Sequence, residues 1–387
     1  MLDRRTLRNL DLVFVFTVLL LLGASLFILS TASYNVDKAD PYHYVKQQAF
    51  WIGAGLIVAL FMAAVDYQKW RKLSWWIYAF NIGLLIAVFI FGTSAKGAQR
   101  WIPTPFGFNI QPSEFAKIFI IITFADFLAK REGKLNNYRD FIVPFLYVLV
   151  PMLLIYQQPD LGTTMVFLAI FIGMMFVAGA NPWKLGGLLV GLAIFAILML
   201  WIHFSPDLPV WLQWAQNIPL PLEDYQLNRL TIFLDPTSDT SGDGYHIIQS
   251  IWAIGSGGLW GKGYRAGTQG QLNFLPEHHT DFIFSVVGEE FGFIGTATLL
   301  FLFLLFLMRC INIGMKARDT YGMLLVSGIV SMYTFHILVN VGMTSGIMPV
   351  TGIPLPFISY GGSMMLTNMV AIGLLISINL RRQRLMF

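Results

Sequence analysis

Ten predominantly apolar runs divide this chain, and they constrain its fold more than any other feature. Each is close to the roughly 20 residues that an α-helix needs to cross the hydrocarbon core of a bilayer. The runs occupy residues 12–31, 47–66, 73–93, 113–131, 141–158, 161–179, 185–203, 281–308, 321–343 and 361–380. Because backbone groups in lipid must find partners within the protein, we expect an all-α, polytopic integral membrane protein with ten transmembrane helices.

The composition supports the same class of protein. Hydrophobic residues make up 56% of the 387 residues and charged residues only 12%, whereas soluble domains are about one quarter charged. The single cysteine, Cys310, excludes an intramolecular disulfide and any CxxC metal or redox motif. No small-residue cleavage site clearly follows the first run, so we expect no cleavable signal peptide.

Lysine and arginine are distributed unevenly between the two sets of loops. An even number of spans puts both termini on one side, and 17 of the 25 basic residues fall on that side. They are Arg4, Arg5, Arg8, Lys69, Arg71, Lys72, Lys130, Arg131, Lys134, Arg139, Lys184, Arg309, Lys316, Arg318, Arg381, Arg382 and Arg384. Basic residues accumulate in cytoplasmic loops, so we predict that both termini are cytoplasmic.

The predicted topology leaves one long extracellular loop, residues 204–280, between the seventh and eighth helices. Proline and glycine interrupt it too often for a separate globular domain, so we expect residues 1–387 to form a single transmembrane domain that contains this loop. Tryptophan favours the membrane interface, and Trp201, Trp211 and Trp214 therefore predict a segment lying along the outer surface.

A glycine-rich stretch, residues 255–271, resembles a phosphate-binding P-loop only superficially. Ser256 occupies the position of the first glycine of that motif, and Gly263 stands where a hydroxyl is required. Two interpretations remain open for this stretch: a binding loop for an extracellular phosphate or sugar, or a flexible connector.

Four ionisable side chains precede the eighth apolar run: Glu277, His278, His279 and Asp281. A charge beside a low-dielectric medium is costly, so such residues are candidates for function. Asp281 is the candidate base, because a carboxylate at a helix mouth contacts both water and the edge of the membrane.

Glu114, Lys117 and Asp160 are further candidates on the same side of the membrane. Glu114 and Lys117 are three residues apart and share one face of a helix that starts near Pro112. The structural alternatives are an ordinary ion pair for these two and a helix N-cap for Asp160. Together with Asp281, they favour an outward-facing cavity.

The histidines and two glutamates of the eighth run are weaker candidates. His278, His279 and the isolated His336 form no HxxxH or HExxH pattern, so we expect no dedicated zinc site. Glu289 and Glu290 lie about 12 Å along the helix from the candidate base. We expect them to be solvated or to face a cavity.

Four long motifs occur in order: RWIPTPFGFNIQPSEFAKI, QQPDLGTT, GLWGKGYRAGTQGQLNFLPEHHTDFIFSVVGEE and PVTGIPLPFISYGGSMM. They resemble the hallmarks of the SEDS family (shape, elongation, division and sporulation) over nearly the whole chain. GTQGQLNFLPEHHTDF, with the short N-terminus, is more similar to the rod-shape member than to the division member. The ten transmembrane helices of the family agree with the number of apolar runs.

The resemblance implies a peptidoglycan glycosyltransferase that polymerises lipid II into glycan strands on the outer face of the bacterial cytoplasmic membrane, during elongation and shape maintenance. It places the essential aspartate of the family at Asp281 and further functional positions at Glu114, Lys117 and Asp160. The partners that it implies are lipid II, the nascent strand, membrane lipid and a class B penicillin-binding protein, with no nucleic acid. A division or sporulation role is the alternative within the family.

The chemistry of such a polymerase assigns roles to these residues. Lipid II carries an α-linked sugar and the polymer is β-1,4-linked, so one inverting displacement is required, with Asp281 as the general base. The pyrophosphate leaving group needs charge stabilisation, from basic side chains or from a divalent cation; no cofactor is certain. The expected substrate-binding or cavity residues are Glu114, Lys117, Asp160, Lys262, Arg265, Glu277 and His279.

Two other classes of function are weighed against this one. A flippase or transporter of the lipid-linked precursor would suit charges within spans, but transporters usually place polar groups near the midplane and contain paired repeats. We find no internal repeat. A non-catalytic scaffold would not need an acidic residue at a cavity mouth. Since the chain has no SxxK motif combined with KTG, cross-linking requires another protein.

Overall fold

The computed structural model describes residues 9–36, 40–95, 98–104, 107–205, 224–239, 242–272 and 274–382, most of them in helices. The helices are α2 (Leu12–Ala32), α3 (His43–Ala64), α4 (Tyr67–Lys72), α5 (Ser74–Phe91), α6 (Pro112–Ala129), α7 (Tyr138–Tyr156), α8 (Leu161–Val177), α9 (Pro182–Phe204), α10 (Asp224–Leu234), the 3₁₀ helix η2 (Pro236–Ser238), α11 (Asp243–Gly257), α12 (Thr268–Gln271), α13 (Ile283–Met315), α14 (Thr320–Thr344) and α15 (Gly362–Leu380). A small antiparallel sheet of β1 (Thr93–Ala95), β2 (Ala98–Pro103) and β3 (Asn109–Ile110) joins α5 to α6, with β2 in the middle.

Eight of the described helices are long and apolar enough to cross a membrane: α2, α3, α5, α7, α9, α13, α14 and α15. The sequence predicted two more spans, where the structure has α6 and α8. α6 carries three charged residues, Glu114, Lys117 and Asp126, and α8 has only 17 residues. Most of α6 is nevertheless buried within the bundle. The count of ten spans therefore stays a prediction.

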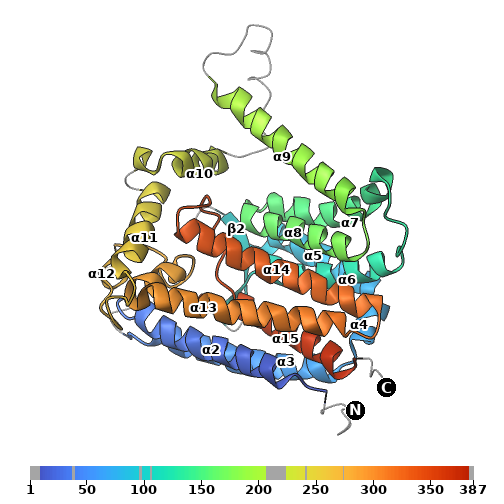
Figure 1. Cartoon of the computed structure of the whole chain (residues 1–387), viewed down its shortest axis with the longest axis horizontal. Coiled ribbons are helices and arrows are strands. Elements are labelled where there is room, and N and C mark those ends of the chain that lie inside the picture. Colours follow the sequence, from blue (N-terminus) through green and yellow to red (C-terminus); the bar gives the residue numbers. More distant parts are fainter. Residues whose placement is uncertain are drawn as a thin grey trace.

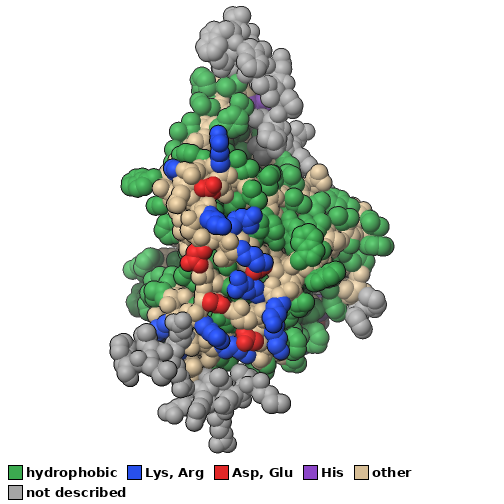
Figure 2. Space-filling view, turned by 90° about the vertical axis from the view of Figure 1, so that its right-hand side faces the viewer, with side chains coloured by type: hydrophobic (Ala, Val, Ile, Leu, Met, Phe, Trp, Pro, Cys, Tyr) green, Lys and Arg blue, Asp and Glu red, His purple; other side chains and the backbone are tan. Residues whose placement is uncertain are grey.

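The long helices lie side by side, and the start of α2 and the end of α15 lie at the same end of the bundle (Figure 1). Asn9 Nδ2 donates a hydrogen bond to Leu380 O across these two ends, at 3.2 Å. We call this end the basic end, because lysine and arginine side chains gather on it, with acidic side chains between them (Figure 2). The buried Asp126 pairs there with Arg71 at 3.0 Å and with Lys130 at 2.6 Å.

The opposite end carries α10, α11 and α12, and we call it the loop end (Figure 1). These helices come from the described part of the predicted extracellular loop, and α11 packs against α13. The interfacial segment predicted around Trp211 and Trp214 lies outside the described residues. The later part of α9 projects away from the other helices (Figure 1), and only 6% of its apolar window is buried.

Close helix contacts hold the centre of the bundle together. A methyl group at Gly173 of α8 would lie 1.8 Å from Ser331 Oγ of α14, and one at Gly373 of α15 would lie 2.6 Å from Ala59 O of α3. Small residues allow such contacts, and van der Waals packing replaces the hydrophobic effect as the main attraction between helices in lipid. α15 is the most buried of the eight apolar helices, at 83% of its window.

Candidate functional site

Asp160 begins α8 and ties it to the start of α6. Its Oδ1 accepts a hydrogen bond from Thr163 N at 3.1 Å, which confirms the predicted N-cap. Its Oδ2 accepts from Ser113 Oγ at 3.3 Å, and Arg100 of β2 lies 4.0 Å from Oδ1. The carboxylate is only 6% exposed. Asp160 therefore acts as a cap and also joins the sheet, α6 and α8 at the loop end.

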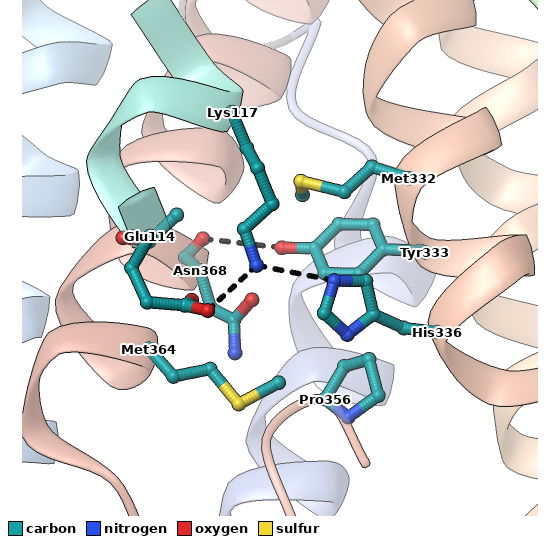
Figure 3. A pocket seen from close by; sticks show the side chains of 9 residues that line it. Glu114, Lys117, Met332, Tyr333, His336, Pro356, Met364 and Asn368 are labelled. Carbon is teal, nitrogen blue, oxygen red and sulfur yellow. Dashed lines mark hydrogen bonds and ion pairs between the residues drawn. The ribbon is translucent and has the colours of Figure 1, made fainter. Parts of the chain in front are cut away.

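Glu114 and Lys117 form a buried ion pair in the first two turns of α6. Lys117 Nζ donates to Glu114 Oε1 at 2.8 Å and also lies 3.1 Å from His336 Nε2 of α14 (Figure 3). An ammonium group can only donate, so Nε2 accepts and the ring proton is on Nδ1. That Nδ1 donates to Pro354 O at 3.2 Å. His336 thus connects Lys117 to the segment between α14 and α15.

The three side chains line a narrow pocket with residues from α14, α15 and the segment before α15 (Figure 3). The other lining residues are Met332, Tyr333, Pro356, Met364, Thr367 and Asn368. Glu114 Oε2 has no hydrogen-bond partner among the described residues, although it is buried. The pocket therefore contains an acceptor that nothing in the described chain satisfies.

The segment of residues 345–361, which we call the α14–α15 loop, is irregular, and its later part, residues 353 and 355–359, is buried. Its carbonyl groups are satisfied by side chains from surrounding helices. Gln48 Nε2 of α3 donates to Phe357 O at 3.4 Å and to Ser359 O at 3.3 Å, and Ser25 Oγ of α2 donates to Ile358 O at 3.4 Å. Non-helical backbone at membrane depth is tolerated only where protein groups or trapped water satisfy it.

Asp281 lies against this loop. Its side chain is partly exposed, and a methyl group at Gly352 would be 3.5 Å from Asp281 Oδ2. Three consecutive carbonyl groups accept hydrogen bonds here. His279 O accepts from the amide of Tyr360 at 3.1 Å, Thr280 O from a serine hydroxyl of the loop at 2.7 Å, and Asp281 O from Asn340 Nδ2 at 2.9 Å. The backbone that carries the candidate base is therefore fixed.

Lys262 and Arg265 lie on the glycine-rich stretch, and both have protein partners. Lys262 Nζ forms a 2.6 Å ion pair with Glu289 Oε1. The guanidinium of Arg265 lies 4.1 Å from the ring centre of Tyr34 and donates to Tyr42 Oη at 2.9 Å. That hydrogen bond raises the pKa of Arg265. These cations are arranged to hold the stretch against α2, α3 and α13.

Glu277 and His279 occupy the turn before Asp281. Glu277 has a φ of 52°, a strained value for a residue with a side chain, and its carboxylate accepts from Thr280 Oγ1 at 3.1 Å. The ring of His279 packs on Tyr44 with 4.7 Å between ring centres. Burial lowers the pKa of neighbouring His278, so that ring is neutral at neutral pH.

The expectation that Glu289 and Glu290 are solvated or face a cavity is wrong. Each is 1% exposed. Besides Lys262, Glu289 Oε1 accepts from Thr268 N at 2.7 Å, and Glu290 Oε2 accepts from Arg265 N at 3.2 Å. Helix spacing alone gave their depth along α13 but could not show that the glycine-rich stretch folds back over them.

A break in α13 explains the glycines of this stretch. Gly292 has a φ of 63°, so the helix is interrupted there. The freed amide of Phe293 donates to Gly258 O at 2.9 Å, while Gly263 N donates to Glu290 O at 2.9 Å. A methyl group at Gly261 would lie 2.1 Å from Glu290 O. The stretch is therefore packed backbone to backbone on α13.

Glu289→Ala is expected to lower the free energy of unfolding by about 3 kcal/mol, because it leaves Lys262 and buried amide groups without their acceptor. The measurement is thermal unfolding of the purified protein. Lys46→Ala is the matched control, since the pair that Lys46 forms with Asp40 is exposed at 69% and 39% and should contribute little. Equal unfolding temperatures for both variants would contradict the anchoring role of Glu289.

The α14–α15 loop lies close to three of the candidates. Gly352 of the loop borders the carboxylate of Asp281. Pro354 O binds His336, which in turn binds Lys117. The carbonyl oxygen of residue 351 packs against the start of α8, where a methyl group at Gly162 would be 3.0 Å away, two residues after Asp160. From the sequence, Arg100 and Asn340 had no expected site role, and His336 was considered only as a metal ligand. They lie within helices or strands and form no recognisable motif with other polar residues. Only Arg100 falls within one of the four family motifs, which was the one sign in the sequence that it could belong to the site. Among the described residues, no group of three or more His, Cys, Asp and Glu side chains could hold a metal ion.

This fold and site define a polytopic membrane protein with a polar, partly buried site at one end of its helix bundle. The chain belongs to the FtsW/RodA/SpoVE family of cell cycle proteins, which matches residues 10–384, and it is a multi-pass protein of the cytoplasmic membrane. The match confirms the family resemblance of the sequence motifs.

Two curated relatives illustrate the similarity. The chain is 37% identical over 369 residues to the peptidoglycan glycosyltransferase MrdB of Escherichia coli, covering 95% of this chain and 94% of that protein. It is 38% identical over 378 residues to the stage V sporulation protein E of Bacillus subtilis, covering 95% and 96%.

Solved structures agree. One, described as structural coordination of polymerization and crosslinking by a peptidoglycan synthase complex, matches with a TM-score of 0.74 and 31% identity over 95% of this chain and 96% of that chain. The rod shape determining protein RodA of Thermus thermophilus matches with a TM-score of 0.68 and 27% identity over 96% and 97%.

Proposed function

We propose that this protein is a peptidoglycan glycosyltransferase that polymerises lipid II into glycan strands during cell elongation and shape maintenance. The observation that carries the proposal is a partly exposed carboxylate, Asp281, on a backbone held by three consecutive hydrogen bonds. A reacting group carried by a backbone that is held in place is what a catalytic site requires. The names of the curated relatives support the same chemistry.

The topology that we propose has ten spans, with α6 and α8 added to the eight apolar helices, in a single transmembrane domain. The basic end then faces the cytoplasm, and the loop end, with the site, faces outward. This orientation places the site where the sugars of lipid II are exposed after translocation. The prenyl tails lie between helices in the bilayer.

The reaction is one inverting displacement. The 4-hydroxyl of the acceptor sugar attacks the anomeric carbon of the donor, the bond from that carbon to the pyrophosphate oxygen breaks, and the β-1,4 bond forms. The hydroxyl proton passes to Asp281. The polyprenyl pyrophosphate leaves as an anion and is stabilised by positive charge at the site.

Lys117 is the best-placed cation for this role. It is 2% exposed and already shares its charge with Glu114, so its field acts through a medium of low dielectric. Glu114 Oε2, which has no partner among the described side chains and backbone groups, is available to a sugar hydroxyl. Asp160, with Arg100 beside it, completes the proposed cavity. Lys262, Arg265, Glu277 and His279 support its outer side.

The test is polymerisation of labelled lipid II by the purified protein, with products separated by size before and after digestion with a muramidase. We expect polymers that the muramidase degrades, because a muramidase cleaves β-1,4-linked glycan. Movement of lipid II across vesicles without polymer would support the transporter alternative. Binding of lipid II without either activity would support the scaffold alternative.

A class B penicillin-binding protein is the partner that we propose, since this chain carries no transpeptidase motif. The structural relative within a peptidoglycan synthase complex supports a partner of this kind. We place the contact on lipid-facing helices together with the loop of residues 204–280. A partner that favours one state of this loop would shift the position of Asp281.

Co-purified partner is therefore expected to raise the rate of polymerisation at saturating lipid II. Deletion of residues 235–244 should remove most of this increase. Replacement of the same residues by a Gly-Ser segment of equal length tests whether the sequence of the loop or its length matters. Equal rates with and without the partner, unchanged by the deletion, would exclude activation through this loop.

A further inference from the structure

His336 and Asn340 are buried polar residues of α14 to which the proposed mechanism gives no role. They are four residues apart, so they lie one turn apart on the same face of the helix. We propose that they are positioning residues, which hold Asp281 at a fixed distance from Lys117 by binding consecutive residues of the α14–α15 loop. The inference rests on the proposed function of Asp281 as the base.

Asn340 holds the backbone at Asp281 directly. The residue is fully buried, and Nδ2 donates to Asp281 O at 2.9 Å and to Ile353 O at 2.8 Å. Both partners are carbonyl oxygens, so the orientation of the amide follows from its contacts. One side chain therefore uses both of its hydrogens to join the segment that carries the candidate base to the α14–α15 loop.

His336 makes the corresponding connection to Lys117. Its Nε2 accepts from Lys117 Nζ at 3.1 Å, and its Nδ1 donates to Pro354 O at 3.2 Å. It is 3% exposed, and Figure 3 shows the ring between the lysine and the loop proline Pro356. The ring is used at both nitrogens, so it fixes the position of the ammonium group.

The two connections meet on three consecutive residues of the loop. Gly352 borders the carboxylate of Asp281, Ile353 O binds Asn340, and Pro354 O binds His336. A displacement of this short segment therefore moves the base and the cation relative to each other. Misplacement of a reacting group by about 1 Å can reduce a rate by roughly 100-fold.

A purely structural role for the two residues would be to satisfy buried carbonyl groups. α14 offers a matched example of that role in Ser327, whose Oγ donates to Gly173 O of α8 at 3.0 Å. No hydrogen bond or ion pair within the described part of the chain joins Ser327 to the loop or to a candidate site residue. Positioning and structural roles can therefore be compared on one helix.

The experiment measures kcat and KM for lipid II polymerisation in Asn340→Leu, His336→Leu, His336→Gln and the control Ser327→Ala. Asn340→Leu removes both donated hydrogen bonds but keeps the branched shape of the side chain, and His336→Leu removes the donor and the acceptor of the ring. We expect kcat to fall roughly 10- to 100-fold with KM changed by less than about threefold. His336→Gln keeps one acceptor and one donor, so it should recover most of kcat, and the control should match the wild type.

Hydrogen exchange of the loop amides gives a second readout. We expect faster exchange at the amides of residues 351–353 and of Leu355 in the leucine variants, and no change there in the control; residues 354 and 356 are prolines without an amide hydrogen. If a leucine variant does not fold, Asn340→Ser and His336→Gln decide the question. Serine has one hydrogen on a shorter side chain, so it cannot bind both carbonyls that Asn340 binds, and kcat should still fall. Wild-type kcat in Asn340→Ser, or no recovery in His336→Gln relative to a folded His336→Leu, would overturn the inference.

Asp281→Asn, measured in parallel, separates this inference from the proposed function. If Asp281→Asn is inactive while folded Asn340→Leu and His336→Leu have wild-type kcat, the positioning role is wrong and the base assignment stands. If Asp281→Asn is fully active, the base assignment itself fails. A rise in KM without a fall in kcat would also reject positioning of the reacting groups.

Discussion

Asp281→Asn is expected to abolish lipid II polymerisation, with a loss on the order of 100-fold or more. The substitution preserves the size of the side chain but removes the group that takes the proton. The hydrogen bonds that hold this segment use the main-chain carbonyls of residues 279–281, so the fold should not change. The measurement is the rate of glycan formation by purified protein with an unchanged unfolding temperature.

Asp40→Asn is a suitable control for this substitution. Asp40 is an exposed carboxylate in the connection between α2 and α3, where it pairs with Lys46. Conversion of this carboxylate to an amide should leave polymerisation unaltered. Near-normal turnover by a well-folded Asp281→Asn protein would remove Asp281 as the general base.

Lys117→Met is expected to reduce both activity and stability. Glu114 would remain 6% exposed with no ammonium partner, and removal of one member of a buried ion pair costs about 3–5 kcal/mol. Loss of the cation should also lower the rate by roughly 100-fold, the scale of one lost electrostatic contact to a developing anion. Unfolding temperature and initial polymerisation rate measure the two effects separately.

The double variant Lys117→Met with Glu114→Gln distinguishes these effects. It removes both charges, so most of the stability should return, because a neutral replacement of a buried pair is often tolerated. Activity should stay low. Recovery of polymerisation in the double variant would show that the pair serves the fold and not the reaction.

The apolar pattern predicted the helices well because lipid imposes one simple requirement on a spanning segment. Local spacing also predicted the ion pair of Glu114 with Lys117 and the cap at Asp160, since both depend on residues three positions apart. These features could be derived without knowledge of the rest of the chain.

The remainder of the site depends on contacts between distant segments. Asn340 binds Asp281 across 59 positions of sequence, and Gln48 binds the loop at Phe357 across 309. Hydrophobic periodicity does not predict contacts between such distant residues. The sequence also does not show whether a buried asparagine binds a loop or another helix. The wrong expectation for Glu289 had the same origin, because its partners belong to a stretch that folds back over α13.

The hydrogen bonds of the α14–α15 loop have a consequence for the biogenesis of this protein. The donors that shape the loop come from α2, α3 and α14, which enter the membrane at different stages of synthesis. A nascent chain whose first two spans are displaced lacks part of this set, so the loop cannot reach its final conformation beside Asp281. We therefore expect a chain with misplaced first spans to lack polymerase activity until insertion is complete.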